Sequence, residues 1–200
     1  LKDISPTDLG MHAAKAALEQ AGVSPTDIDH VIVGNVLHSA PDSIYSPRHI
    51  GLKCGVPEAV PALGVNRLCG SGFQSIIDAY QQMAAGDTKV ALVGGIENMS
   101  LSPYVLRAAR WGLRMGHNQI TDSMTESLTD TYAGAPMAIT AENLAEKFKI
   151  SREEADAFAI QSQKKFKEAL DKIEALIAKD EKLKRRTAER EARRQRRKRK

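Results

Sequence analysis

Cys69 has the strongest chemical context in this 200-residue chain. An apolar, strand-like run over residues 62–68 ends at this thiol, Gly70 and Gly72 follow, and a helical pattern then begins. A thiolate is favoured at the start of a helix, because the helix dipole is positive there. The two glycines leave the backbone open to a close ligand. The pattern indicates a nucleophile, but the residue types alone fit a small buried hydrophobic cysteine equally well.

The other candidate residues give weaker signals. Cys54 sits between a lysine and a glycine near a predicted helix end, which favours a structural thiol. Two cysteines make neither a disulfide framework nor a zinc pattern, so a reducing compartment is expected. His38 and His49 stand 11 positions apart with no carboxylate at ligand spacing, so we expect no metal site. Gly94-Gly95 and the Gly70–Gly72 pair extend to neither a dinucleotide nor a P-loop pattern, and close packing around Cys69 explains both.

Strands and helices alternate over the first half of the chain. Helices are predicted from an N-cap at Ser5 to Gly22, over residues 47–53, and from about residue 73 to Gly86, and short apolar strands are predicted at residues 31–33, 62–68 and 89–93. This order predicts a layered α/β fold with a largely parallel sheet. Ligands collect at the carboxyl ends of such strands, where both Cys69 and Gly94-Gly95 are expected.

Three regions follow from the pattern. Residues 1–96 form the α/β core, and residues 97–163 form a loop-rich segment in which Thr140 is expected to cap one helix and Ser151 with Glu154 to cap the next. Residues 164–200 form a basic tail that is helical or disordered.

The charge is unevenly distributed between the body and the tail. Residues 1–163 hold 12 Lys and Arg against 18 Asp and Glu, whereas residues 164–200 hold 17 against 7. The basic tail could bind a polyanion, but it lacks aromatic residues interleaved with its Lys and Arg for base stacking, so a solvated run is the better interpretation and no specific nucleic acid is expected. No secretion signal or membrane span is apparent.

Three motifs in order carry a resemblance to the thiolase family. They are NRLCGSG at residues 66–72, GGIENMS at 94–100 and PMAITAEN at 136–143. The chain is most similar to degradative 3-ketoacyl-CoA thiolases (acetyl-CoA acyltransferases), and the resemblance covers about residues 1–165. The second and third motifs favour this family over ketoacyl synthases, which also place a cysteine before a helix.

The resemblance implies a thiolase-like half-fold with a mixed, largely parallel sheet. In that family the cysteine matching Cys69 attacks a 3-ketoacyl-CoA, acetyl-CoA leaves, and a second CoA takes the acyl group from the enzyme thioester. The backbone N–H at the Cys69 position helps hold the thioester oxygen, with Gly70 and Gly72 supporting the backbone. Coenzyme A is then a substrate, and no cofactor is expected. The family also implies fatty acid β-oxidation, a homo-oligomer, and the cytoplasm or mitochondrial matrix.

Met99 and Met137 are candidates for contact with the acyl chain, together with Tyr104, Trp111 and Met115. Met137 has the better support, because it sits just before the run Ile139–Glu142 in the third motif. Ordinary packing explains each of these side chains equally well.

The chain also departs from the thiolase pattern. Family members are much longer, and their second half supplies an activating histidine, an asparagine and a second cysteine, whereas the last histidine here is His117 and the last cysteine is Cys69. The family's first strand would lie ahead of Leu1, and the basic tail is unlike a thiolase. We therefore expect a truncated N-terminal half with impaired activity and a large exposed apolar face. The alternative is a noncatalytic interaction module or a basic-tailed polyanion binder.

Overall fold

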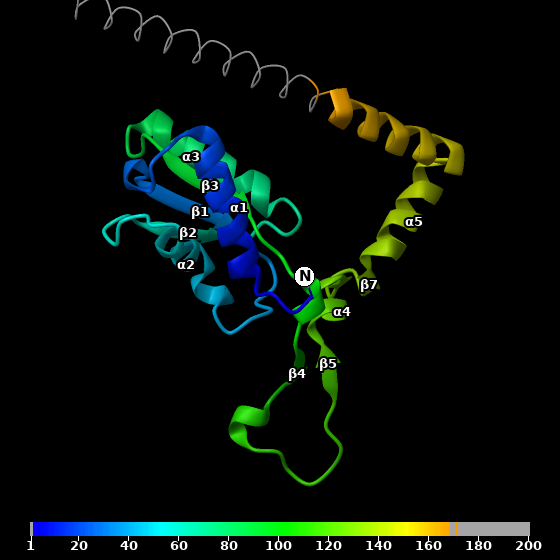
Figure 1. Ribbon diagram of the computed structural model, residues 1–200. Helices are drawn as coiled ribbons and strands as arrows, with labels where there is room; N and C mark the ends of the chain where they lie inside the picture. Colours follow the sequence, from blue (N-terminus) through cyan, green and yellow to red (C-terminus); the bar gives the residue numbers. More distant parts are fainter. Residues whose placement is uncertain (1, 169–170, 172–200) are drawn as a thin grey trace, which may run out of the picture. The chain divides into compact units, whose positions relative to one another are not determined.

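The computed structural model describes residues 2–168 and 171, and the chain divides into two units, Leu1–Pro136 and Met137–Lys200. The first unit is built on a parallel three-stranded sheet in the order β2-β1-β3 (Figure 1). Its strands are β1 (His30–Gly34), β2 (Ala62–Val65) and β3 (Ala91–Gly95). The α/β class and the parallel sheet expected from the sequence are confirmed.

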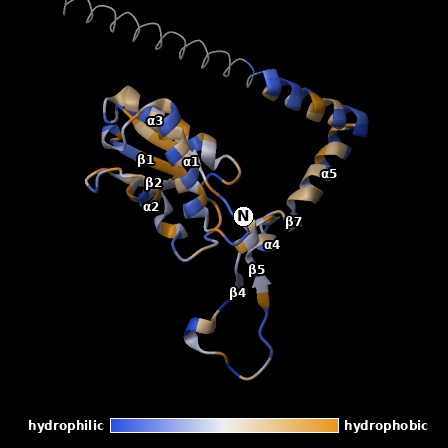
Figure 2. Ribbon diagram, viewed as in Figure 1, coloured by the Kyte–Doolittle hydropathy of each residue, from blue (hydrophilic) through white to orange (hydrophobic). Residues whose placement is uncertain are grey.

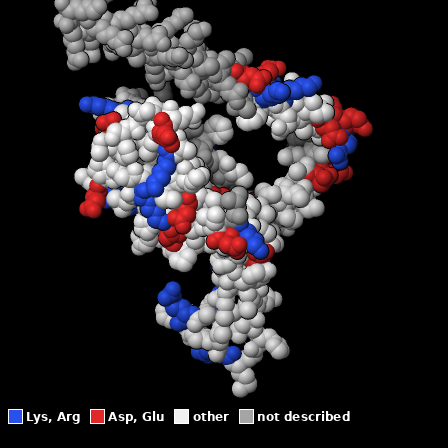
Figure 3. All heavy atoms as spheres, in the orientation of Figure 1, with Lys and Arg blue, Asp and Glu red and all other residues white. Residues whose placement is uncertain are grey.

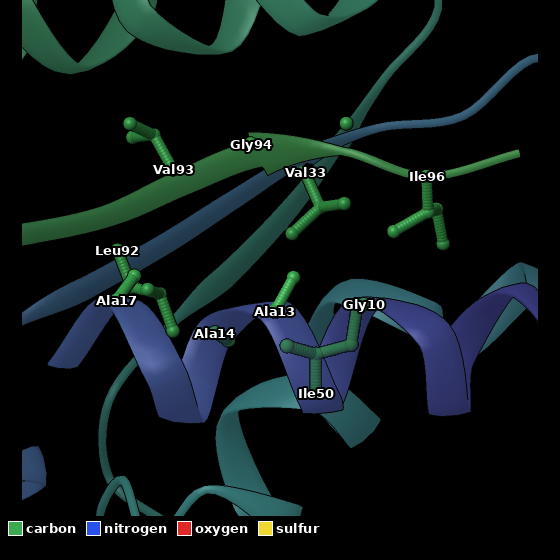
Figure 4. Close-up of a pocket in the computed structure, with 11 residues that line it drawn as sticks. Gly10, Ala13, Ala14, Ala17, Val33, Ile50, Leu92, Val93, Gly94 and Ile96 are labelled. Carbon is green, nitrogen blue, oxygen red and sulfur yellow. The ribbon is translucent and has the colours of Figure 1, made fainter. Parts of the chain in front are cut away.

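Helices cover both faces of this sheet. The helices α1 (Pro6–Ala21) and α2 (Ser46–Lys53) pack against each other on one face, and α3 (Ser71–Ala85) packs on β1 and β3 from the other (Figures 1 and 4). The sequence predicts both ends of α1 correctly. Ser5 caps its start by accepting the Asp8 N–H at 3.1 Å, and Gly22 ends it with a left-handed φ of 64°.

The hydrophobic core is centred on β1. Its residues Val31, Ile32 and Val33 are at most 4% exposed, because this middle strand is covered by helices on both faces. The middle strand β1 is correspondingly coloured as hydrophobic in Figure 2. Side chains from both helices of the α1/α2 layer complete the core, among them Ala14, Leu18, Ile50, Cys54 and Val56.

Three predicted boundaries were wrong. The strand expected over residues 62–68 ends at Val65, because residues 66–70 form a tight turn. The strand expected at residues 89–93 is shifted two positions, to Ala91–Gly95. Thr140 does not cap its helix, because α5 (Met137–Phe148) already begins three residues earlier and the Thr140 hydroxyl donates back to the Met137 carbonyl at 2.6 Å.

The loop-rich part of the first unit contains small elements. Two antiparallel pairs are present, β4 (Tyr104–Leu106) with β5 (Ile120–Asp122) and β6 (Thr129–Asp130) with β7 (Ala135–Pro136), and α4 (Ser123–Ser127) follows β5. Single 3₁₀ turns occur in this segment at Met99–Leu101 and Ala109–Trp111. Two more occur earlier, in the α/β core, at Pro25–Asp27 and Ser43–Tyr45. The loop-rich segment contributes little to the core, since most of its side chains are exposed.

The second unit contains α5 and a further helix over residues 152–168. The predicted capping box is confirmed: Ser151 Oγ accepts the Glu154 N–H at 3.1 Å, and the Glu154 carboxylate accepts the Ser151 N–H at 2.8 Å. Most of the basic tail lies outside the described residues. On the face shown in Figure 3, acidic and basic side chains are mixed over most of the described residues, whereas only basic ones are visible on the lower lobe. Within this described part, no helix has the length and hydrophobicity that a membrane crossing needs.

Helix α3 packs on the sheet through its small residues. Ser71, Ser75 and Ala79 are buried at spacings of four, whereas Phe73 and Tyr80 are 77% and 71% exposed. Phe73 and Tyr80 belong to an exposed apolar stripe along α3. Its other members are Ile76, Ile77 and Met83. The structure therefore carries the large exposed apolar face that the sequence led us to expect.

This arrangement predicts that substitutions on the two faces of α3 differ in their effect on the free energy of unfolding. Replacing the fully buried Ser75 with leucine should lower the free energy of unfolding by about 1–3 kcal/mol, because the larger branched side chain has no room between the helix and the sheet. Replacing Phe73 with serine should change it by less than about 0.5 kcal/mol. Urea unfolding followed by circular dichroism measures both values. A larger loss for Phe73→Ser than for Ser75→Leu would show that we have assigned the packed face wrongly.

Candidate active site

The site centres on the turn that joins β2 to α3. Two side chains hold this turn. Asn66 Oδ1 accepts the Leu68 N–H at 3.0 Å, and Ser71 Oγ accepts the Arg67 N–H at 2.9 Å while donating to the Leu68 carbonyl at 2.6 Å. Backbone bonds from Gly70 to Arg67 and from Ser71 to Leu68 tighten it further. The chain therefore reverses within five residues, directly before α3.

Leu68 occupies a left-handed conformation, with a φ of 48°. A residue with a Cβ atom pays roughly 1–2 kcal/mol there, so the surrounding hydrogen bonds must keep it in place. The next residue, Cys69, is exposed and lies two positions ahead of the first residue of α3. The strand–turn–helix context predicted for this thiol is confirmed, and the interpretation of Cys69 as a buried structural cysteine is excluded.

Glycines let the first turn of α3 approach the sheet closely. A Cβ atom on Gly34, at the end of β1, would lie 2.5 Å from the carbonyl carbon of Ser71. A Cβ atom on Gly95, at the end of β3, would lie 3.2 Å from the Cα atom of Gly72. Neither strand end therefore has room for a side chain. This contact fixes the start of α3, and with it Cys69, over the carboxyl ends of the strands.

The two cysteines have different environments. Cys54 is 8% exposed, and its thiol points to the Met11 carbonyl with a sulfur–oxygen distance of 3.7 Å. Burial raises the pKa of the Cys54 thiol, and the nearby charge of Lys15 opposes this shift only in part. The prediction of a structural role for Cys54 is therefore confirmed, and Cys69 is the accessible thiol.

Glu97 organises the neighbouring strand end, which the sequence did not predict. Its carboxylate accepts the side-chain amide of Asn35 at 3.1 Å and the backbone N–H groups of Val36 and Leu37 at 3.0 and 3.2 Å. Asn35 Nδ2 also donates to the Ile96 carbonyl at 3.1 Å. These bonds join the segment after β3 to the loop after β1. Glu97 belongs to the motif at residues 94–100. The sequence therefore singled out its position but did not reveal that its carboxylate binds the loop after β1.

The predicted substrate-contact residues are exposed and stay a prediction. Met99 begins a 3₁₀ turn in the first unit, beside an open hollow that Tyr104, Asp122 and Met124 also line. Met137 begins α5 in the second unit. Trp111 and Met115 are almost fully exposed as well. An acyl chain would therefore have apolar side chains to contact in either unit.

A separate apolar cavity of about 150 Å³ lies between α1 and the sheet (Figure 4). Val33, Leu92 and Ile96 point from the strands towards α1, and small residues such as Gly10 and Ala13 line the helix side. The lining residues contain no ionisable or nucleophilic side chain, so this cavity belongs to core packing. Among the described residues, no group of three or more His, Cys, Asp or Glu side chains is arranged to hold a metal ion.

These features define a parallel α/β protein that presents an exposed cysteine at the start of a helix. Residues 1–192 match the family described as "Thiolase, N-terminal domain". The chain therefore belongs to the thiolase family. The match extends past residue 165, where we expected the resemblance to end, because all three recognisable motifs lie before residue 144 and gave no signal for the later part.

The relatives that match this chain in sequence are described as thiolases and acyltransferases. The chain is 52% identical to human mitochondrial 3-ketoacyl-CoA thiolase over 172 residues, which are 86% of this chain and 43% of that protein. It is 46% identical to a probable acetyl-CoA acyltransferase of Staphylococcus aureus (strain COL), covering 82% of this chain and 42% of the relative.

Solved structures extend the likeness to the fold. The crystal structure of human mitochondrial 3-ketoacyl-CoA thiolase in complex with CoA matches with a TM-score of 0.77 at 53% identity, over 86% of this chain and 44% of that one. The acetyl-CoA acetyltransferase of Bacillus anthracis matches with a TM-score of 0.75 at 36% identity, over 86% and 43%. The chain thus spans less than half the length of these relatives.

The different burial of the two thiols predicts selective labelling. At neutral pH, iodoacetamide should alkylate Cys69 at least about tenfold faster than Cys54, because the second thiol is both buried and shifted towards its unreactive protonated form. Peptide mass spectrometry after a short exposure gives both rates. Above the raised pKa of Cys54 the difference should shrink. Equal rates at neutral pH would contradict the packing of Cys54.

The close contact at Gly34 predicts a strong effect of one methyl group. Gly34→Ala should lower the free energy of unfolding by about 1–3 kcal/mol, because backbone atoms of Ser71 must move away. Gly94→Ala is the matched control, since a Cβ atom there meets no atom within 4 Å, and it should cost less than about 0.5 kcal/mol. Urea unfolding tests both variants. A neutral Gly34→Ala would show that α3 does not press on β1.

Proposed function

We propose that this chain is the acyl-carrying half of a 3-ketoacyl-CoA thiolase, with Cys69 as the residue that takes the acyl group. One observation supports this most directly: an exposed thiol stands at the start of α3, over the carboxyl ends of parallel strands, in a chain of the thiolase family. The substrate class comes from the relatives, whose names describe 3-ketoacyl-CoA thiolases and acetyl-CoA acyltransferases.

The chemistry requires a group that both attacks and leaves well, which a thiolate does. Cys69 Sγ attacks the keto carbon of a 3-ketoacyl-CoA. The bond between that carbon and the α-carbon breaks, the α-carbon takes a proton, and acetyl-CoA leaves. The acyl group remains on Sγ as a thioester. The thiolate of a second CoA then attacks this thioester, and Cys69 regains its proton as the shortened acyl-CoA departs.

The residues around Cys69 would assist in two ways. The backbone N–H of Cys69 would stabilise the oxyanion of the tetrahedral intermediate, as donors do in other acyl-transfer sites. Gly70 and Gly72 would let the thioester come close to the backbone, because neither carries a side chain. We assign residues 1–96 to this acyl-carrying core, residues 97–163 with Met99 and Met137 to substrate binding, and residues 164–200 to a basic tail.

The wider role follows from the same relatives. A solved relative is described as a complex with CoA, so CoA thioesters are the proposed substrates and no further cofactor is needed. We place the activity in fatty acid β-oxidation, in a homo-oligomer, and in the mitochondrial matrix or cytoplasm, in agreement with the mitochondrial relatives.

We expect slow turnover from the chain as it stands. It holds no histidine after His117 and no cysteine after Cys69, so the partners that thiolases use to activate the nucleophile are not supplied by these 200 residues. The exposed apolar stripe of α3 favours a second possibility, a noncatalytic module that docks onto another protein through this surface.

Acylation of Cys69 separates these two possibilities. Incubation with acetyl-CoA at neutral pH should transfer one acetyl group, and intact mass spectrometry followed by peptide mapping should place it on Cys69. Cys69→Ser should abolish the transfer, because a serine hydroxyl has no activating base here. Cys54→Ser is the matched control and should keep it. A chain that takes no acetyl group, or takes it equally on lysines, would favour the docking module instead.

A further inference from the structure

The peptide before Cys69 is held by a side chain that the proposed chemistry does not use. Asn66 Oδ1 accepts the N–H of Leu68 at 3.0 Å, while the Leu68 carbonyl accepts the hydroxyl of Ser71 at 2.6 Å. Both polar backbone groups of Leu68 are therefore bound. This matters because Leu68 has a φ of 48°, which a leucine rarely adopts, and its side chain is 67% exposed and can anchor it only weakly.

Asn66 also connects this turn to the ends of the other two strands. Its Nδ2 donates to the Val36 carbonyl in a long contact of 3.5 Å, and the Val36 N–H donates to Glu97 Oε2 at 3.0 Å. A line of hydrogen bonds thus runs from the segment after β3, through the loop after β1, to the residue before Cys69. The side chain of Asn66 is the link nearest to the thiol.

We propose that Asn66 is a positioning residue for Cys69. By accepting the Leu68 N–H, it holds Leu68 in the left-handed conformation and so sets the direction in which the Cys69 thiol leaves the start of α3. This inference rests on the proposed function, since direction matters only if the thiol must meet a carbonyl carbon. Small errors in the position of a nucleophile are costly, because the reacting atoms must approach along a narrow range of directions.

Three variants isolate the role of this side chain. Asn66→Ala removes the acceptor, whereas Asn66→Asp keeps an oxygen acceptor, loses the donor to Val36 and adds a negative charge, so it is compared with Asn66→Ala through the conformation of Leu68 alone. The double variant Asn66→Ala with Leu68→Gly removes the acceptor and also the penalty for a positive φ, because glycine adopts such angles freely. Asn118→Ala, on an exposed loop, is the matched control for the change of asparagine to alanine.

Two measurements on the full chain test the proposal. In ¹⁵N-leucine-labelled protein, a strong nuclear Overhauser effect between the amide and α protons of Leu68 marks the positive φ. The rate of acyl transfer from acetyl-CoA to Cys69, followed by intact mass, reports the direction of the thiol. Asn66→Ala should weaken the proton signal and slow acyl transfer about tenfold or more, whereas Asn118→Ala should resemble the wild type in both measurements and Asn66→Asp should keep the proton signal. The double variant should recover to within about threefold of the wild-type rate, which a loss of stability alone would not do.

The outcomes are distinguishable from failure of the proposed function. If the wild type takes no acetyl group, acyl transfer is wrong, and the proton signal of Leu68 still decides whether Asn66 holds the turn. If Asn66→Ala keeps both the signal and the rate, or if Asn66→Asp weakens the proton signal of Leu68 as much as Asn66→Ala does, the positioning role is overturned. An Asn66→Ala variant that is slow, but is not rescued by Leu68→Gly, overturns it as well.

Discussion

The contact between the first turn of α3 and the ends of β1 and β3 is the constraint on which the site depends. Gly34 and Gly95 bring backbone against backbone, so the helix starts at one position over the sheet. The Ile96 N–H reinforces this edge by donating to the Gly34 carbonyl at 2.9 Å. A helix seated on larger side chains would stand farther from the strand ends. The position of Cys69 is therefore set by glycines that carry no reactive side chain.

The same close seating explains why α3 exposes its large side chains. A helix that packs through serine and alanine buries little apolar area on the sheet, and its opposite face carries phenylalanine, isoleucine and tyrosine. Such a face lowers its free energy only when another surface covers it. The chain covers less than half the length of its thiolase relatives, so an uncovered layer at this point agrees with the share of the fold that is present.

The sequence predicted the helices and strands better than it predicted where the strands end. Ser5 and Gly22 bounded α1 correctly, because capping depends on neighbouring residues alone. The end of β2 was placed three residues late, because Asn66 and Ser71 act on the backbone through hydrogen bonds that apolar periodicity does not reveal. Glu97 was missed as an organiser for a related reason: its partners, Asn35 to Leu37, lie about 60 positions away in the chain.

With the geometry known, the motif at residues 66–72 can be explained residue by residue. Asparagine supplies an acceptor for the amide two residues on, and Leu68 takes the left-handed conformation that this acceptor holds. Gly70 precedes the helix without a capping side chain, and the Ser71 hydroxyl holds the preceding turn by bonding to the backbone of Arg67 and Leu68. Gly72 lies against Gly95, whose own Cβ atom would lie 3.2 Å from the Cα atom of Gly72. Asn66 and Ser71 therefore have a conformational reason for their residue types, and the thiol differs from Cys54 because this frame keeps it outside the core.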